Sequence, residues 1–105
     1  MSPERLDVVP ASIPQFNPSY RGLHHKPAPD VYLVAADHLD IEPARCVAVE
    51  DSFNGVRSGA AAGMRTIMVP DYNEPTPEIR ALCAEVLTTL HELPAALDRL
   101  KTPNV

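Results

Sequence analysis

Two short apolar runs, separated by a segment of helix-forming residues, constrain the fold of this chain most strongly. The runs cover residues 46–49 and 66–69, and an alanine-rich segment at 54–62 lies between them and ends at Gly63. A continuous apolar run is typical of a strand that is buried on both faces. The 16 residues 50–65 are long enough for a crossover that joins parallel strands. We therefore expect a right-handed strand–helix–strand unit whose two strands are parallel neighbours, with the helix covering one face.

The rest of the chain extends this unit into an α/β fold. A helix is expected after Pro29, because apolar residues follow it at the spacing of one helix face: Val31, Val34, Ala35 and Leu39. Further helices are expected at 76–84 and 90–100, and a short strand at 86–88. Another short strand is expected at 6–9. Together these elements predict an α/β fold with a parallel sheet and flanking helices.

The prolines divide the chain into a core and an irregular leading segment. Six of the twelve prolines fall within the first thirty residues. Each proline fixes φ, removes a backbone donor and disfavours helix in the residue before it. We therefore expect a proline-rich irregular segment at 1–25, which includes the short strand, a core portion at 26–101, and a frayed tail at 102–105.

Composition excludes several classes of protein. Nine basic residues against fourteen acidic ones give a net charge of −5, without the basic run that a nucleic-acid partner would require. The longest apolar run has six residues, at 31–36, which is too short to cross a bilayer. Cys46 and Cys83 lack the spacing of a metal site. We expect a cytoplasmic protein with reduced thiols and no membrane association.

An acidic pair, Glu50 and Asp51, directly follows the first apolar run. Ligands of open α/β sheets bind beyond the carboxyl ends of the strands, and carboxylates are suitable ligands for Mg²⁺. The alternative is that the pair decorates a helix N-terminus, where the helix dipole favours acidic residues. Ser52 is either the N-cap of that helix or a group that orients an acidic neighbour. Asn54 is either part of a turn or the first residue of the helix.

Lys26 lies in the irregular region before the first expected helix. A lysine is a compact charge suited to a phosphate group, although a solvated surface lysine is the alternative. His24 and His25 precede it, and the sequence assigns them no role.

Three motifs in order give the chain a specific resemblance. They are the string from Lys26 to Asp30, the sequence Glu50-Asp51-Ser52-x-x-Gly55, and the string from Ala60 to Met64. The chain resembles the haloacid dehalogenase superfamily, and more narrowly its phosphoglycolate phosphatase and β-phosphoglucomutase-like branch. The resemblance implies a Rossmann-like core and Mg²⁺-dependent phosphoryl transfer to and from an aspartate, acting on a small phosphorylated metabolite.

The resemblance also implies roles for individual residues. Lys26 corresponds to the family lysine that holds the nucleophile and the transferring phosphoryl oxygens. Asp51 corresponds to a direct Mg²⁺ ligand, and Glu50 to a ligand that acts directly or through water. Ser52 and Asn54 are neighbours of this site. No cofactor other than Mg²⁺ is implied.

The chain departs from the family before Lys26. The family's Asp-x-Asp motif, which supplies the nucleophile and the general acid/base, has no counterpart. Neither does the strand that ends in a phosphoryl-binding Ser or Thr, since Ser12 lies among prolines, nor the helical cap domain. Asp71, which precedes Asn73 by two residues, is a poor rival nucleophile because Asn73 cannot act as an acid.

Three readings follow from this departure. The chain is the C-terminal part of a hydrolase, a non-catalytic remnant that acts as a protein-interaction module, or one half of a split enzyme that needs a complementing chain. In each case we expect it to be inactive alone and to bind Mg²⁺ weakly.

The resemblance also yields expectations about geometry. In the family the nucleophile strand lies beside the acidic-pair strand. Its absence predicts that the strand at 46–49 is an exposed edge, available for self-association, and that residues 6–9 are detached or poorly packed. Glu50 and Asp51 should project into solvent or a shallow cleft. Lys26 should lie within about one bridging water of a carboxylate.

Overall fold

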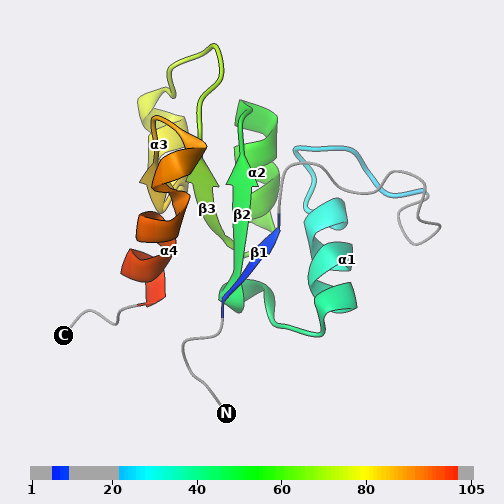
Figure 1. Ribbon diagram of the computed structural model, residues 1–105. Coiled ribbons are helices and arrows are strands. Elements are labelled where there is room, and N and C mark those ends of the chain that lie inside the picture. The colour runs from blue at the N-terminus through cyan, green and yellow to red at the C-terminus, as the bar shows by residue number, and fades with distance from the viewer. Residues whose placement is uncertain (1–5, 10–21, 102–105) are drawn as a thin grey trace.

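Four parallel strands form the centre of the molecule (Figure 1). The computed structural model describes residues 6–9 and 22–101. The strands lie in chain order across the sheet: β1 Asp7–Val9, β2 Cys46–Glu50, β3 Arg65–Met68 and β4 Glu85–Val86. The parallel pairing of β2 with β3 and the helix between them confirm the expected strand–helix–strand unit.

Helices cover both faces of the sheet. Helices α1 Asp30–Leu39, α2 Phe53–Ala61 and α3 Pro77–Leu82 lie on one face, and α4 Leu93–Lys101 lies on the other (Figure 1). Two short 3-10 turns, η2 Pro43–Arg45 and η3 Leu90–Glu92, precede β2 and α4. The predicted α/β fold with flanking helices is therefore confirmed, although several elements begin or end one to three residues from their expected bounds.

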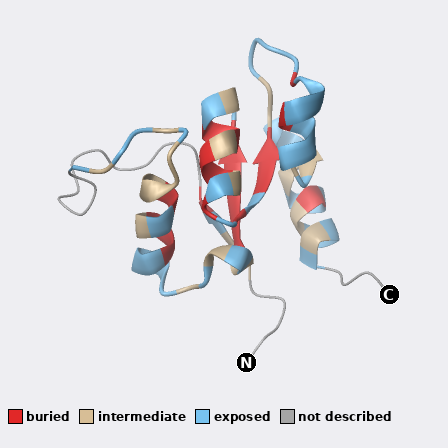
Figure 2. Ribbon diagram, turned by 180° about the vertical axis from the view of Figure 1, so that it is seen from behind, coloured by how far each residue is buried: buried red, intermediate tan, exposed pale blue. Residues whose placement is uncertain are grey.

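The core follows the alternation of side chains along the strands. Cys46 and Ala48 face α1 and α2, whereas Val47 and Val49 face α4. All five residues of β2 are buried, and Figure 2 shows the buried residues concentrated in the sheet and on the helix surfaces that cover it. This burial on both faces is what the continuous apolar run predicts.

Helix α2 follows the acidic pair at the end of β2, and it begins and ends as its sequence predicts. The side chain of Ser52 accepts a hydrogen bond of 3.0 Å from the backbone N–H of Gly55, so it caps the N-terminus of α2. Gly63, just beyond the helix, has a φ of 83°. Gly59 brings α2 close to the sheet, because a Cβ there would lie 2.8 Å from the Cβ of Ala48.

Helix α1 buries a face that matches the expected one only in part. Its buried residues are Tyr32, Ala35 and Ala36, whereas Leu39 is 40% exposed. Of the expected face, Ala35 is buried, Val31 and Val34 are half-buried and Leu39 is exposed, so the expectation is wrong at Leu39. The two alanines let α1 approach the sheet closely, and the tyrosine finds a buried hydrogen-bond partner there.

The C-terminal helix is tied to the sheet by an ion pair. The guanidinium of Arg99 in α4 donates hydrogen bonds of 2.5 and 2.9 Å to the carboxylate of Glu85 in β4. These bonds hold the pKa of the Glu85 carboxyl below its usual value. The short strand β4 is thereby joined to α4 through side chains as well as to β3 through its backbone.

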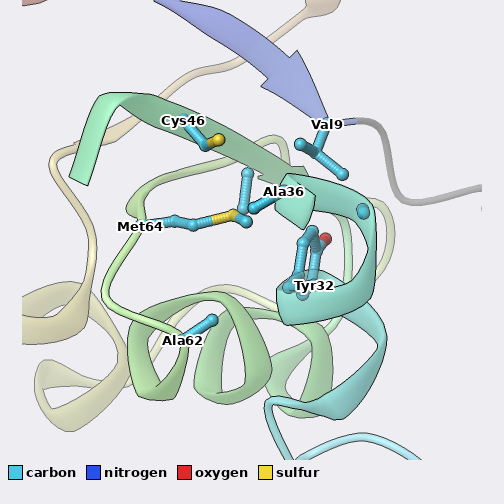
Figure 3. Close-up of a cluster of buried hydrophobic side chains, with 8 residues drawn as sticks. Val9, Tyr32, Ala36, Cys46, Ala62 and Met64 are labelled. Carbon is cyan, nitrogen blue, oxygen red and sulfur yellow. The ribbon is translucent and has the colours of Figure 1, made fainter. Parts of the chain in front are cut away.

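The position of β1 overturns one expectation. Residues 6–9 are not detached: β1 pairs in parallel with β2, and Asp7, Val8 and Val9 lie opposite residues 46–48. The strand at 46–49 is therefore an interior strand and not an exposed edge. Figure 3 shows Val9 in the same apolar cluster as Tyr32 and Cys46. The pairing gives backbone groups of β2 hydrogen-bond partners, and the burial of Val9 removes apolar surface from water. Both effects favour the position of β1 beside β2.

Two further expectations concern parts of the chain outside the described ranges. Of the proline-rich segment at 1–25, residues 1–5 and 10–21 lie outside the described residues, as does the tail at 102–105. Within residues 6–9 and 22–101, no helix has the length and apolar character needed to cross a membrane.

The pairing of β1 can be tested with two neighbouring valines. Val9 is 3% exposed and Val8 is 38% exposed. We expect Val9→Ala to lower the free energy of unfolding by about 1–2 kcal/mol, because it removes buried methyl groups, and Val8→Ala to change it by less than about 0.5 kcal/mol. Urea unfolding followed by circular dichroism measures both. Equal, small effects at the two positions would show that β1 is not packed.

Candidate functional site

Residues from two distant parts of the chain meet at the C-terminal end of β2. Glu50 is the last residue of the strand, and Lys26 lies in the loop before α1. The Nζ atom of Lys26 donates a hydrogen bond of 2.5 Å to Oε2 of Glu50. The hydroxyl of Tyr32, in the first turn of α1, donates to the same oxygen. The lysine and one member of the acidic pair are thus in direct contact, which is within the distance of one bridging water that was expected.

Glu50 points into the protein. Its side chain is only 1% exposed, so the expectation that it projects into solvent or a cleft is wrong. The reason is its place in the strand: Glu50 lies on the same face as Cys46 and Ala48, beneath α1 and α2. Gly55 leaves the space for its carboxylate, because a Cβ at that position would lie 1.7 Å from Oε1. Such a buried charge is tolerated only when donors compensate it.

Lys26 is held between the carboxylate and an aromatic ring. Its side chain is 25% exposed, and Nζ lies 5.2 Å from the centre of the Tyr32 ring. This distance is within the range of a cation–π attraction. The ammonium group is therefore restrained from two sides by Glu50 and Tyr32.

The loop that carries Lys26 is fastened to both neighbouring helices. The buried hydroxyl of Ser58 in α2 donates a hydrogen bond of 2.7 Å to the carbonyl of Ala28. At the start of α1, the carboxylate of Asp30 accepts a hydrogen bond of 3.0 Å from the backbone N–H of His24, and Nδ1 of His24 lies 2.9 Å from the same oxygen. The backbone N–H of His24 lowers the pKa of the Asp30 carboxyl most strongly. His24 therefore closes the loop, while no contact within residues 6–9 and 22–101 assigns a role to the side chain of His25.

Asp51 faces the other way, into an open hollow of about 610 Å³. The hollow is formed by residues that follow the C-terminal ends of β2 and β3 and by the first turns of α2. Its lining consists of Asp51, Ser52, Phe53, Asn54, Arg57, Asp71, Tyr72 and Asn73. Two neighbouring side chains of one acidic pair thus have different environments, one buried and one exposed.

The loop after β3 belongs to this hollow. Asp71 and Asn73 were considered in the sequence only as rival catalytic residues, and Tyr72 was missed. The signal that places them here is their position after a parallel strand, because the carboxyl ends of neighbouring parallel strands meet at one edge of the sheet. Asp71 therefore shares the hollow with Asp51, and Tyr72 is 92% exposed at its rim.

Ser52 and Asn54 have structural roles as well as a place in the hollow. Ser52 caps α2, and Oδ1 of Asn54 accepts a hydrogen bond of 3.2 Å from Arg57. Arg57 in turn donates a hydrogen bond of 3.0 Å to Glu78 of α3. The capping role of Ser52 explains its contacts without a ligand, and its expected role as a neighbour of the metal stays a prediction.

The residues fit a loosely held Mg²⁺ at Asp51 but not direct ligation by Glu50. The carboxylate of Glu50 is buried and its Oε2 is already engaged by an ammonium and a hydroxyl. Among residues 6–9 and 22–101, no three acidic, histidine or cysteine side chains converge as a metal-binding group. Asp51 alone of the pair presents a carboxylate to the hollow, and Mg²⁺ commonly retains several waters when it has few protein ligands.

The dependence of Glu50 on Lys26 can be measured through stability. We expect Lys26→Met to lower the free energy of unfolding by about 3 kcal/mol, because it removes the cation from a buried carboxylate. Lys101→Met is the matched control at the exposed end of α4, and Asp51→Asn tests the other acid of the pair. Both should change stability by less than about 0.5 kcal/mol. A Lys26→Met variant as stable as the control would show that the contact does not persist in solution.

Known proteins share both the sequence and the fold of this chain. The haloacid dehalogenase-like hydrolase family matches residues 7–63, more than half of the chain. Hexitol phosphatase B of Escherichia coli K12 is 45% identical over 73 residues, which are 69% of this chain and 32% of that protein. A HAD family hydrolase from Deinococcus radiodurans R1, whose crystal structure contains phosphate and sodium, superposes with a TM-score of 0.66 and 40% identity over 80% of this chain and 39% of that one.

A second solved structure agrees. CbbY from Rhodobacter sphaeroides, in complex with phosphate, gives a TM-score of 0.62 and 38% identity over 71% of this chain and 34% of that one. The matched part of the chain covers between 18% and 34% of the length of several curated relatives, so the match spans about a third of these proteins at most. With its motifs, its sheet and these matches in agreement, the chain belongs to the haloacid dehalogenase-like hydrolase family, in its phosphatase branch.

Proposed function

We propose that this chain supplies the lysine and acidic-pair portion of a Mg²⁺-dependent phosphoryl-transfer site that acts on a small phosphorylated metabolite. The observation that carries the proposal is the contact between Lys26 and Glu50 at the C-terminal end of β2, beside Asp51. It brings a cation and an outward-facing carboxylate together where parallel α/β sheets bind ligands.

Each residue has a distinct task in this proposal. Lys26 would stabilise the negative charge that develops on the phosphoryl oxygens during transfer. Asp51 would be the direct ligand of Mg²⁺, which supplies further charge stabilisation when bound. Glu50 would act on the metal through water at most, because its carboxylate is committed to Lys26 and Tyr32.

The nucleophile of the proposed reaction lies outside these 105 residues. The sequence contains no Asp-x-Asp motif, and a covalent step needs an attacking carboxylate. The residues of this chain alone would therefore be inactive and would bind Mg²⁺ weakly. The missing motif would come from further sequence of the same protein or from a complementing chain.

Relatives guide the choice of substrate class and location. Hexitol phosphatase B acts on hexitol phosphates by its name, and a mutant of CbbY was crystallised with xylulose-(1,5)bisphosphate. Sugar and sugar-alcohol phosphates are therefore the first substrates to test.

The free cysteines Cys46 and Cys83 would suit a reducing compartment such as the cytoplasm.

Activity is best tested by complementation. The purified chain should not hydrolyse p-nitrophenyl phosphate or sugar phosphates with Mg²⁺. Adding a separately produced N-terminal segment of a relative that contains Asp-x-Asp should generate turnover above that of the segment alone. Turnover should be lost when Lys26→Met or Asp51→Asn is used, or when the segment carries Asn-x-Asn.

The outcomes separate the three readings. Complementation that depends on Lys26 supports a truncated or split hydrolase. Silence with every segment, alongside specific binding of another protein, supports the non-catalytic remnant. Activity of the chain alone that vanishes on Asp51→Ala would contradict the proposal and make Asp71 the first candidate nucleophile.

Metal binding can be tested without activity. Mn²⁺, a paramagnetic substitute for Mg²⁺, should broaden the amide NMR signals of residues around the hollow, and excess Mg²⁺ should reverse the effect. We expect Asp51→Asn to abolish most of the broadening, because it removes the outward carboxylate. Asp37→Asn, at an exposed carboxylate of α1, is the matched control and should change nothing there. Broadening that survives Asp51→Asn would place the metal elsewhere.

A further inference from the structure

We infer that the hydroxyl of Tyr32 is a positioning group for Lys26 and acts through the carboxylate of Glu50. Two donors from different elements bind the same oxygen, Oε2 of Glu50. Lys26 belongs to the loop before α1, and Tyr32 belongs to α1. The inference rests on the proposed function only for the task that Lys26 is positioned to perform.

The core holds the side chain of Tyr32 in one position, so its hydroxyl can fix the position of the Glu50 carboxylate. It is 0% exposed, and its ring packs in the apolar cluster between α1, α2 and the sheet (Figure 3). Val9 of β1 and Ala36 of α1 lie in the same cluster. A side chain packed in this way has little freedom to move its hydroxyl, so the position of Oε2 is defined by the core.

The hydroxyl is a permanent donor. Burial, and then the neighbouring carboxylate of Glu50, raise the pKa of Tyr32 far above its usual value. The group therefore keeps its proton throughout the pH range in which proteins are folded. A buried carboxylate without this donor would lose one of its two hydrogen bonds at Oε2 and be free to follow the lysine toward solvent.

Within residues 6–9 and 22–101, Lys26 and Tyr32 are the groups that donate hydrogen bonds to the carboxylate of Glu50. Gly55 contributes only space, because it has no side chain, and its backbone N–H donates to Ser52. The carboxylate is therefore located by Tyr32 on the core side and by Lys26 on the side of the loop. Since Lys26 is partly exposed and Tyr32 is not, Tyr32 fixes the carboxylate and the carboxylate fixes the ammonium.

The chain offers a direct readout, because Lys26 and Lys101 are its only lysines. Competitive acetylation with a small amount of acetic anhydride, followed by mass spectrometry, gives the labelling of Lys26 relative to the exposed Lys101. In Tyr32→Phe, which keeps the ring, we expect this ratio to rise about fivefold, the change that corresponds to one typical hydrogen bond. Tyr72→Phe removes an exposed hydroxyl and should leave the ratio unchanged.

A double-mutant cycle distinguishes positioning from general loosening. Glu50→Met removes the acceptor through which Tyr32 is inferred to act, so adding Tyr32→Phe to it should not raise the ratio further. Additive effects of the two changes would overturn the inference. So would a Tyr32→Phe variant that melts at a lower temperature with an unchanged labelling ratio, because that is the result of a purely structural role.

The inference can also be tested on the unmodified protein. A hydroxyl that is buried and bound to Glu50 should give a slowly exchanging proton signal in the NMR spectrum, close in space to the Tyr32 ring protons. The absence of this signal would overturn the inference even if Tyr32→Phe does not fold. These measurements contain neither phosphate nor metal, so their outcome is independent of the test of phosphoryl transfer.

Discussion

A buried carboxylate at the end of β2 is the constraint on which the surrounding structure depends. Glu50 lies in the interior, where an uncompensated charge is destabilising by several kcal/mol. Its compensation requires Lys26 from the loop and Tyr32 from α1 to arrive at the same oxygen. The loop, the first helix and the central strand are therefore fixed relative to one another by one charge. Gly55 is part of the same constraint, since a side chain there would occupy the space of the carboxylate.

Local patterns in the sequence predicted most of the elements but not all of their neighbours. Continuous apolar runs predicted β2 and β3, and Ser52 and Gly63 predicted where α2 begins and ends. The pairing of β1 could not be predicted in this way, because three residues carry no pattern that selects a partner strand. The expectation of an exposed edge rested on the strand order of the family. It did not consider that residues 7–9 lower the free energy by occupying the place beside β2.

The sequence predicted which residues belong to the candidate site, but it did not predict where their side chains point. The order of the motifs predicted that Lys26 approaches the acidic pair. The inward direction of Glu50 was available in the sequence and was overlooked: position 50 has the parity of Cys46 and Ala48, which face the helices. The role of Tyr32 was less accessible. Its burial depends on how α1 rotates against the sheet, and the apolar spacing had favoured a face containing Val31 and Leu39 instead.

The opposite directions of Glu50 and Asp51 also determine the charge of the hollow. Lys26 and Glu50 neutralise each other, and Arg57 is engaged by Glu78, which leaves Asp51 and Asp71 to set the local potential. Like charges repel, so these two carboxylates oppose the approach of a phosphate group. Under the proposed function, a divalent cation at Asp51 would offset the charge of the two carboxylates, so that a phosphate can bind beside Lys26. The metal would then assist substrate binding as well as the chemistry, because the ammonium group of Lys26 is already paired with Glu50.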